Sequence, residues 1–93
     1  MSDCKTFHGV NQALFDCIKK TSKAEHSTVY DPPTGDKGTA TTDVKFVGKI
    51  VLSFDLNTSA ESIQYCILSK PFLVSASEIF NGIADSINGC RAK

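Results

Sequence analysis

The chain lacks an excess of charge of either sign. Its 93 residues include ten basic and ten acidic side chains, so the formal net charge is zero. Nucleic-acid-binding proteins normally carry a basic excess or a basic stripe, because neutralisation of phosphates supplies most of their non-specific affinity. Here the lysines are scattered along the chain and Arg91 is the only arginine. We therefore expect no nucleic-acid partner, and the charge balance favours no other class of partner.

The chain also lacks a long apolar run. The segment Met1-Ser2-Asp3-Cys4-Lys5 contains none of the hydrophobic residues that form the centre of a secretion signal. No apolar stretch approaches the roughly 20 residues that a membrane-spanning helix needs. We therefore expect a cytoplasmic protein with no membrane partner. The alternative is a secreted protein, in which Met1 would stand in front of a mature chain.

The four cysteines form no CxxC motif of the kind found in metal and redox sites. Cys4, Cys17, Cys66 and Cys90 lie far apart in the chain, and four cysteines allow three pairings between which the sequence cannot choose. One alternative is four reduced, partly buried thiols, as in a cytoplasmic protein. The other is one or two disulfides, for example one from Cys4 to Cys90 that joins the termini. In a secreted protein, Asn57-Thr58-Ser59 would also be a glycosylation sequon, although the tripeptide is equally typical of a turn.

Motifs that would identify a catalytic or metal site are missing as well. His8 and His26 lie eighteen positions apart without the HxH or HxxxH spacing of metal ligands, so we expect no metal and no cofactor. A small enzyme that uses His8 or His26 near the loop at 31–38 remains an alternative. A nucleophilic Cys/His pair, such as Cys17 with His26, is conceivable.

The residues that are present predict one globular domain over residues 1–93. Hydrophobic residues make up 41% of the chain and charged residues 22%, which is the ordinary globular mixture. Apolar residues occupy every even position from 44 to 56, the pattern of a strand with one buried face. Ser75 and Glu78 form a capping box at the start of a second helix, and Gly89 is placed to end it. The periodicity predicts a helix, a short strand, a long strand, a strand and a helix, over residues 9–22, 26–30, 44–56, 62–68 and 76–89.

This order predicts an α+β two-layer sandwich. A three-stranded antiparallel sheet would carry both helices on one face, because each helix has a single apolar stripe to bury. The core would combine apolar positions from the two helices and the long strand, namely Leu14, Ile18, Phe46, Ile50, Leu52, Phe54, Ile83 and Ile87.

The sheet would leave its other face uncovered, and this indicates a function. Val47 and Val51 interrupt the polar positions of the long strand, with Lys49 beside them, and Phe15 falls off the apolar stripe of the first helix. Such residues are candidates for an interaction surface. We therefore expect a small non-enzymatic binding domain that associates with itself as a homodimer through its sheet, or with another protein. The small enzyme and the secreted, disulfide-stabilised protein are the alternatives.

Overall fold

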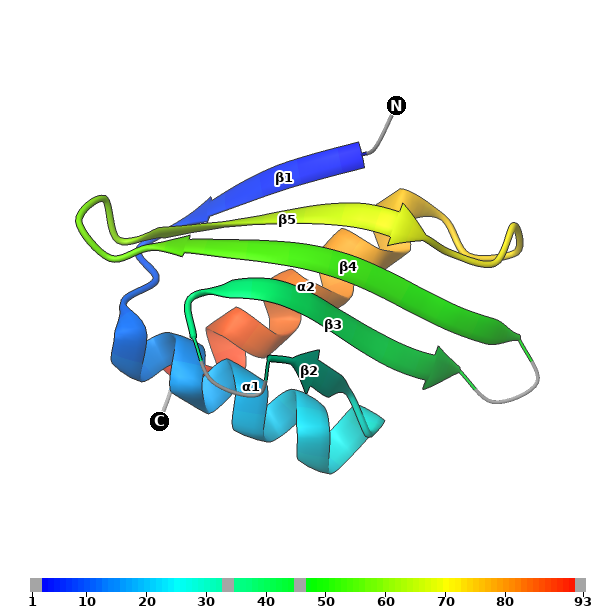
Figure 1. Cartoon of the computed structure of the whole chain (residues 1–93), viewed down its shortest axis with the longest axis horizontal. Helices are drawn as coiled ribbons and strands as arrows, with labels where there is room; N and C mark the ends of the chain where they lie inside the picture. Colours follow the sequence, from blue (N-terminus) through cyan, green and yellow to red (C-terminus); the bar gives the residue numbers. More distant parts are fainter. Residues whose placement is uncertain (1–2, 33–34, 45–46, 92–93) are drawn as a thin grey trace.

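The computed structural model describes residues 3–32, 35–44 and 47–91. Five strands and two helices follow one another along the chain (Figure 1): β1 (Asp3–His8), α1 (Gln12–His26), β2 (Val29–Asp31), β3 (Lys37–Val44), β4 (Gly48–Asn57), β5 (Ser62–Ser69) and α2 (Ala76–Arg91). The strands form one antiparallel sheet in the order β1-β5-β4-β3-β2, and both helices lie on the same side of it. The α+β class is as expected, but the three-stranded sheet is wrong, because the sheet has five strands.

β1 was not predicted from the sequence, because it is an edge strand with almost no apolar residues. Only Phe7 on this strand is even half-buried, so the strand shows no alternation that a sequence can reveal. Its position comes from pairing with β5, where Cys4 lies directly opposite Cys66 and the two form a disulfide. Tertiary pairing, rather than local pattern, makes this segment a strand.

The single strand expected over residues 44–56 is in fact the end of β3, a turn, and β4. Val44 pairs with Gly48 across the hairpin, and Thr42 pairs with Ile50. Residues that pair directly share a face of the sheet, so even positions point inward on both strands. The period-2 pattern therefore runs through the turn without a break and looks like one strand. Gly48 has φ +135°, a conformation that favours glycine, and a Cβ there would meet Pro71 Cγ at 3.1 Å.

α1 begins and ends later than its sequence pattern indicates. The Asn11 side chain caps it by accepting a hydrogen bond from the Leu14 amide at 2.9 Å, and Ser27 ends it in the left-handed region. His26 therefore belongs to the last turn of α1 rather than to a strand. At α2, the Ser75 hydroxyl accepts from the Glu78 amide at 3.1 Å, as expected of the cap, but the helix continues past Gly89 to Arg91.

The core lies between the helices and the inner face of the sheet. Of the expected core residues, Ile18, Leu52, Phe54 and Ile87 are buried, and Leu14, Ile50 and Ile83 are half-buried against them; Phe46 lies outside the described residues. Buried residues outside that list come from several elements, among them Val10, Phe15, Leu56, Ile63, Tyr65, Ile67 and Phe80.

All four cysteines form disulfides, so of the two alternatives the one with disulfides is confirmed and the one with reduced thiols is wrong. The pairs are Cys4–Cys66, between β1 and β5, and Cys17–Cys90, between α1 and α2; the suggested Cys4–Cys90 pairing does not occur. Each bridge joins residues more than 60 positions apart, and together they tie both ends of the chain to its middle. Within the described ranges, neither helix is long and apolar enough to cross a membrane.

Candidate ligand-binding cavity

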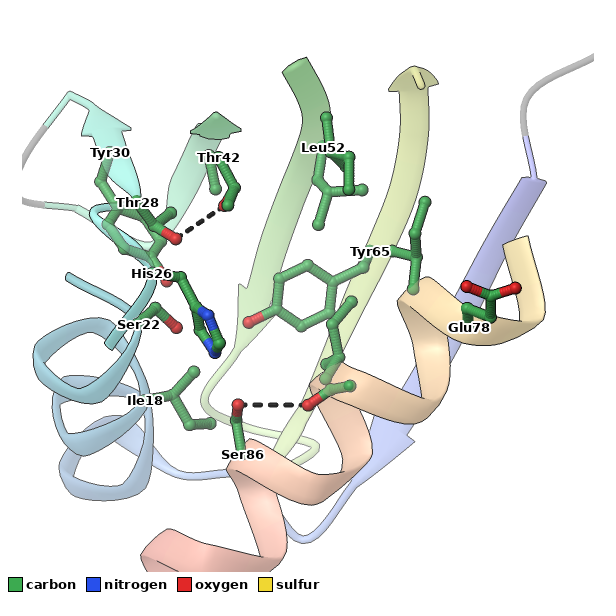
Figure 2. Close-up of a pocket in the computed structure, with 15 residues that line it drawn as sticks. Ile18, Ser22, His26, Thr28, Tyr30, Thr42, Leu52, Tyr65, Glu78 and Ser86 are labelled. Carbon is green, nitrogen blue, oxygen red and sulfur yellow. Dashed lines mark hydrogen bonds between the residues drawn. The ribbon is translucent and has the colours of Figure 1, made fainter. Parts of the chain in front are cut away.

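The inner face of the sheet is not completely filled by the helices. α1 and α2 contact each other through the Cys17–Cys90 bridge, and the Thr21 hydroxyl lies 3.7 Å from Cys90 Sγ. Beyond this contact, between the last turns of α1 and the first turns of α2, a cavity of about 170 Å³ opens over β3, β4 and β5. Figure 2 shows the cavity with the sheet behind it and the two helices on either side.

Aliphatic side chains form most of the cavity wall. They come from both layers of the fold: Ile18 from α1, Ala40 and Leu52 from the sheet, and Ile79 and Ile83 from α2. Small-molecule sites are typically concave and mostly apolar, with a few polar groups that orient the ligand. An apolar cavity of about 150 Å³ is large enough to hold benzene. This cavity therefore has the size and the surface for a single ring.

Tyr65 crosses the cavity and places its hydroxyl inside the fold. Only 3% of the residue is exposed, and Figure 2 shows the hydroxyl pointing across the cavity towards Ser22 and His26. This hydroxyl makes no hydrogen bond to any residue in the described parts of the chain. In those parts every fully buried side-chain nitrogen and oxygen atom has a partner, so the Tyr65 oxygen is not fully buried. The Tyr65 oxygen therefore opens on the cavity. Burial, and to a lesser degree the neighbouring Tyr30, raises the pKa of Tyr65 far above its ordinary value.

Three other polar groups converge on the same side of the cavity. Ser22 and His26 project from the last turns of α1, and Tyr30 projects from β2 (Figure 2). Burial raises the pKa of Tyr30, and the Ser22 hydroxyl, acting as a donor towards the Tyr30 oxygen, opposes this rise. The hydroxyls of Thr28 and Thr42 lie 2.7 Å apart, and one donates a hydrogen bond to the other. Tyr65, which is only 3% exposed, has no such hydrogen bond among the described residues.

Besides the tyrosines, Glu78 and His26 are the ionisable side chains among the described residues that line the cavity. Among the described residues that line it, Glu78 on the first turn of α2 is the one carboxylate, and none is lysine or arginine. Glu78 is exposed and lies at the rim. The cavity therefore offers no fixed cation to a negatively charged ligand.

The residues proposed from the sequence as an interaction surface do not come together in the structure. Val51 and Lys49 do share the outer face of β4, because Ile50 between them points inward. Val47 lies in the turn before β4 rather than on the strand, although it is exposed. Phe15 is fully buried and contacts Phe54, with the ring centroids 5.3 Å apart and the rings tilted by 54°, so its place on a contact surface is wrong.

The two histidines lie on opposite faces of the sheet. His8 ends β1 beside Ser62 on the outer face, whereas His26 lies against the cavity on the inner face. The loop at 31–38 leads into β3 and contacts the middle of α1, where Lys19 Nζ bonds to the Gly35 carbonyl at 3.3 Å. The structure therefore does not bring the histidines together. A Cys17–His26 nucleophilic pair is also wrong, because Cys17 is bonded to Cys90.

Sequence reasoning missed the cavity because its lining residues come from six elements. Tyr65 was visible only as an apolar position of an alternating strand, and His26 was placed in a strand rather than on α1. One signal was available: Tyr65 carries a hydroxyl at an inward position, and a buried tyrosine hydroxyl normally needs a partner. Its partner cannot be located without the tertiary structure.

Comparisons with family models, with curated proteins and with solved structures found no match to this chain.

Proposed function

We propose that this protein is a small non-enzymatic binding domain that holds a ring-sized, mostly apolar ligand in the cavity between its sheet and its helices. The observation that carries the proposal is Tyr65, a tyrosine that is only 3% exposed and whose hydroxyl opens on a mostly apolar cavity. Because this hydroxyl bonds to no described residue and is accessible from the cavity, its hydrogen-bond partner is whatever occupies the cavity. A bound molecule would supply both the apolar filling and the partner.

Two glycines of α2 provide a matched test. Gly82 lines the cavity and Gly89 does not, yet both are helical and a Cβ at either position would meet nothing within 4 Å. Leucine at either position raises helix propensity by a similar amount. Only Gly82→Leu, however, places a side chain at the cavity wall.

The experiment measures binding of α-methylstyrene, a ring-sized hydrocarbon, by calorimetry or NMR titration. We expect the wild type and Gly89→Leu to bind it with similar affinity, and Gly82→Leu to lose at least tenfold in affinity while remaining folded. Equal binding by all three proteins would place the probe elsewhere, and absence of binding by the wild type would refute the proposal.

We also propose that the protein works in an oxidising compartment, outside the cytoplasm. The two disulfides support this, since such bridges persist mainly in secreted proteins. Asn57 is exposed at the end of β4, which suits a glycosylation site, but its side-chain oxygen also accepts from the Ala60 amide at 3.1 Å, as in a turn. Intact mass of protein isolated from its natural source, with and without reductant and glycosidase, tests both points; reduced thiols would contradict the first.

A second candidate function is self-association through the outer face of the sheet. Val29, Thr41 and Val51 lie in register across β2, β3 and β4, which makes a row of β-branched side chains on the face opposite the helices. Val29 is 64% exposed. Such side chains lose little rotamer freedom when they are covered, so a second copy is a plausible partner. Sedimentation would show a dimer that Val51→Glu dissociates; a wild-type monomer at high micromolar concentration would refute this candidate.

A further inference from the structure

The groups around the cavity also define the chemistry of the ligand, and this inference rests on the proposed function. We propose that the ligand is an uncharged, ring-sized molecule with one hydrogen-bond acceptor, such as a ketone, ester or ether oxygen, which accepts a hydrogen bond from the Tyr65 hydroxyl. Three observations carry the proposal: the Tyr65 hydroxyl has no acceptor among the described residues, the cavity wall carries little charge, and the cavity has the volume of a ring-sized molecule.

The Tyr65 hydroxyl is the feature that requires an acceptor. A phenol is a strong donor, and among the described residues this one donates to no acceptor, whereas the hydroxyls of Thr28 and Thr42 bond to each other. The hydroxyl stays protonated because burial opposes its ionisation. A ligand oxygen that points at Tyr65 therefore meets a permanent donor in apolar surroundings, where a hydrogen bond is electrostatically strong.

The charges at the wall disfavour an anionic ligand. A carboxylate or phosphate placed beside Tyr65 would lose its hydration, and no lysine or arginine among the described lining residues could compensate for that loss. The basic side chain of the lining, His26, is exposed at the end of α1. The one carboxylate of the lining, Glu78, would repel the anion further. A neutral carbonyl or ether oxygen has no such cost of burial.

Three probes of nearly the same shape separate these possibilities. α-Methylstyrene, acetophenone and benzoate share a planar ring with a two-branched substituent, but they carry no acceptor, a neutral acceptor and a negative charge, respectively. Each is close to the size of molecule that a cavity of about 170 Å³ holds. The affinity of each probe is measured for the wild type and for Tyr65→Phe, which removes the hydroxyl and keeps the ring.

The informative quantity is the ratio of the acetophenone and α-methylstyrene dissociation constants, because it cancels any general effect of the substitution on the cavity. We expect Tyr65→Phe to shift this ratio against acetophenone by about three- to tenfold, the value of one hydrogen bond. Benzoate should bind more than tenfold more weakly than acetophenone to the wild type.

The infrared carbonyl band of bound acetophenone gives a second readout that does not depend on affinity. A hydrogen bond from Tyr65 should lower the carbonyl stretching frequency in the wild type, and Tyr65→Phe should restore it. If both probes bind with the same ratio to the two proteins, or if benzoate binds as well as acetophenone, the ligand chemistry is wrong and the cavity proposal stands. If no probe binds to the wild type, both proposals fail.

Discussion

At the scale of single residues, the main feature is Tyr65, a buried tyrosine whose hydroxyl lies inside the fold. The alternation of β5 directs this side chain inward with Ile63 and Ile67, so a polar group enters the aliphatic part of the fold. The same burial that keeps Tyr65 neutral in the folded state makes the protein less stable at alkaline pH. An unfolded tyrosine ionises near its ordinary pKa of about 10, whereas folded Tyr65 resists ionisation.

The first prediction follows from this difference. Because the folded pKa of Tyr65 is raised, its contribution to stability is fully present below about pH 10 and is lost as the pH rises above that value. Urea unfolding at pH 8 and at pH 11 should show a larger loss of stability for the wild type than for Tyr65→Phe. Lysine titration affects both proteins alike, so an identical loss in the two would contradict the prediction.

At the scale of secondary-structure elements, the ends of α2 show where local sequence determines structure and where it does not. The Ser75 cap was predicted from the capping-box pattern and is present, because cap chemistry depends only on neighbouring residues. The predicted stop at Gly89 fails, because the Cys17–Cys90 bridge and the bonds from Arg91 to the carbonyls of His8 and Gly9 hold the next turn in place. These partners are about 70 or more positions away in the sequence.

The second prediction tests the cap. Ser75→Ala should lower the free energy of unfolding by about 0.5–2 kcal/mol, since the Glu78 amide loses its acceptor. Ser77→Ala, two positions later and also exposed, is the matched control and should change stability by less than about 0.5 kcal/mol. Chemical denaturation of the three proteins measures both values. A Ser75→Ala effect no larger than that of Ser77→Ala would show that the cap contributes nothing.

The strands show a similar division between local and tertiary information. The alternation of β4 identified its inner face correctly, because a half-buried strand repeats every two residues. The same rule wrongly placed Val44 on one strand with the residues of β4. Val44 ends β3 and pairs with Gly48, so both residues point to the same face of the sheet and the two-residue alternation shows no break. β1 could not be predicted at all, because its partner is β5 and its own residues are mostly polar.

At the scale of the whole molecule, each of the two disulfides joins elements within one layer of the fold, one within the sheet and one between the helices. A small domain has little core, so cross-links between distant residues contribute a large share of its stability. The Cys17–Cys90 bridge fixes α1 against α2 beside the cavity. The Cys4–Cys66 bridge lies on the outer face of the sheet and fixes the edge strand β1 to β5. The cavity itself could not be predicted, because it exists only where six elements meet around Tyr65.

The third prediction concerns these bridges. They close loops of similar length, with sequence separations of 62 and 73, so loop entropy alone predicts a loss of roughly 4 kcal/mol for removing either one. Replacing Cys17 and Cys90 with alanine should also weaken ligand binding, since the helices beside the cavity are then no longer tied. Replacing Cys4 and Cys66 should leave binding unchanged in the folded protein. Equal effects on binding would show that the bridge between the helices has no special part in shaping the cavity.

The central claim is that the cavity between the sheet and the helices is the binding site, and the isoleucines of the chain test it most directly. Ile18, Ile50, Ile79 and Ile83 line the cavity, whereas the other three isoleucines, Ile63, Ile67 and Ile87, are buried elsewhere in the same core. In a titration with α-methylstyrene followed by methyl NMR, we expect the ring to shift the methyl signals of the first four and to leave those of the other three nearly unchanged. Shifts spread equally over both groups, or no shifts at all, would contradict the account.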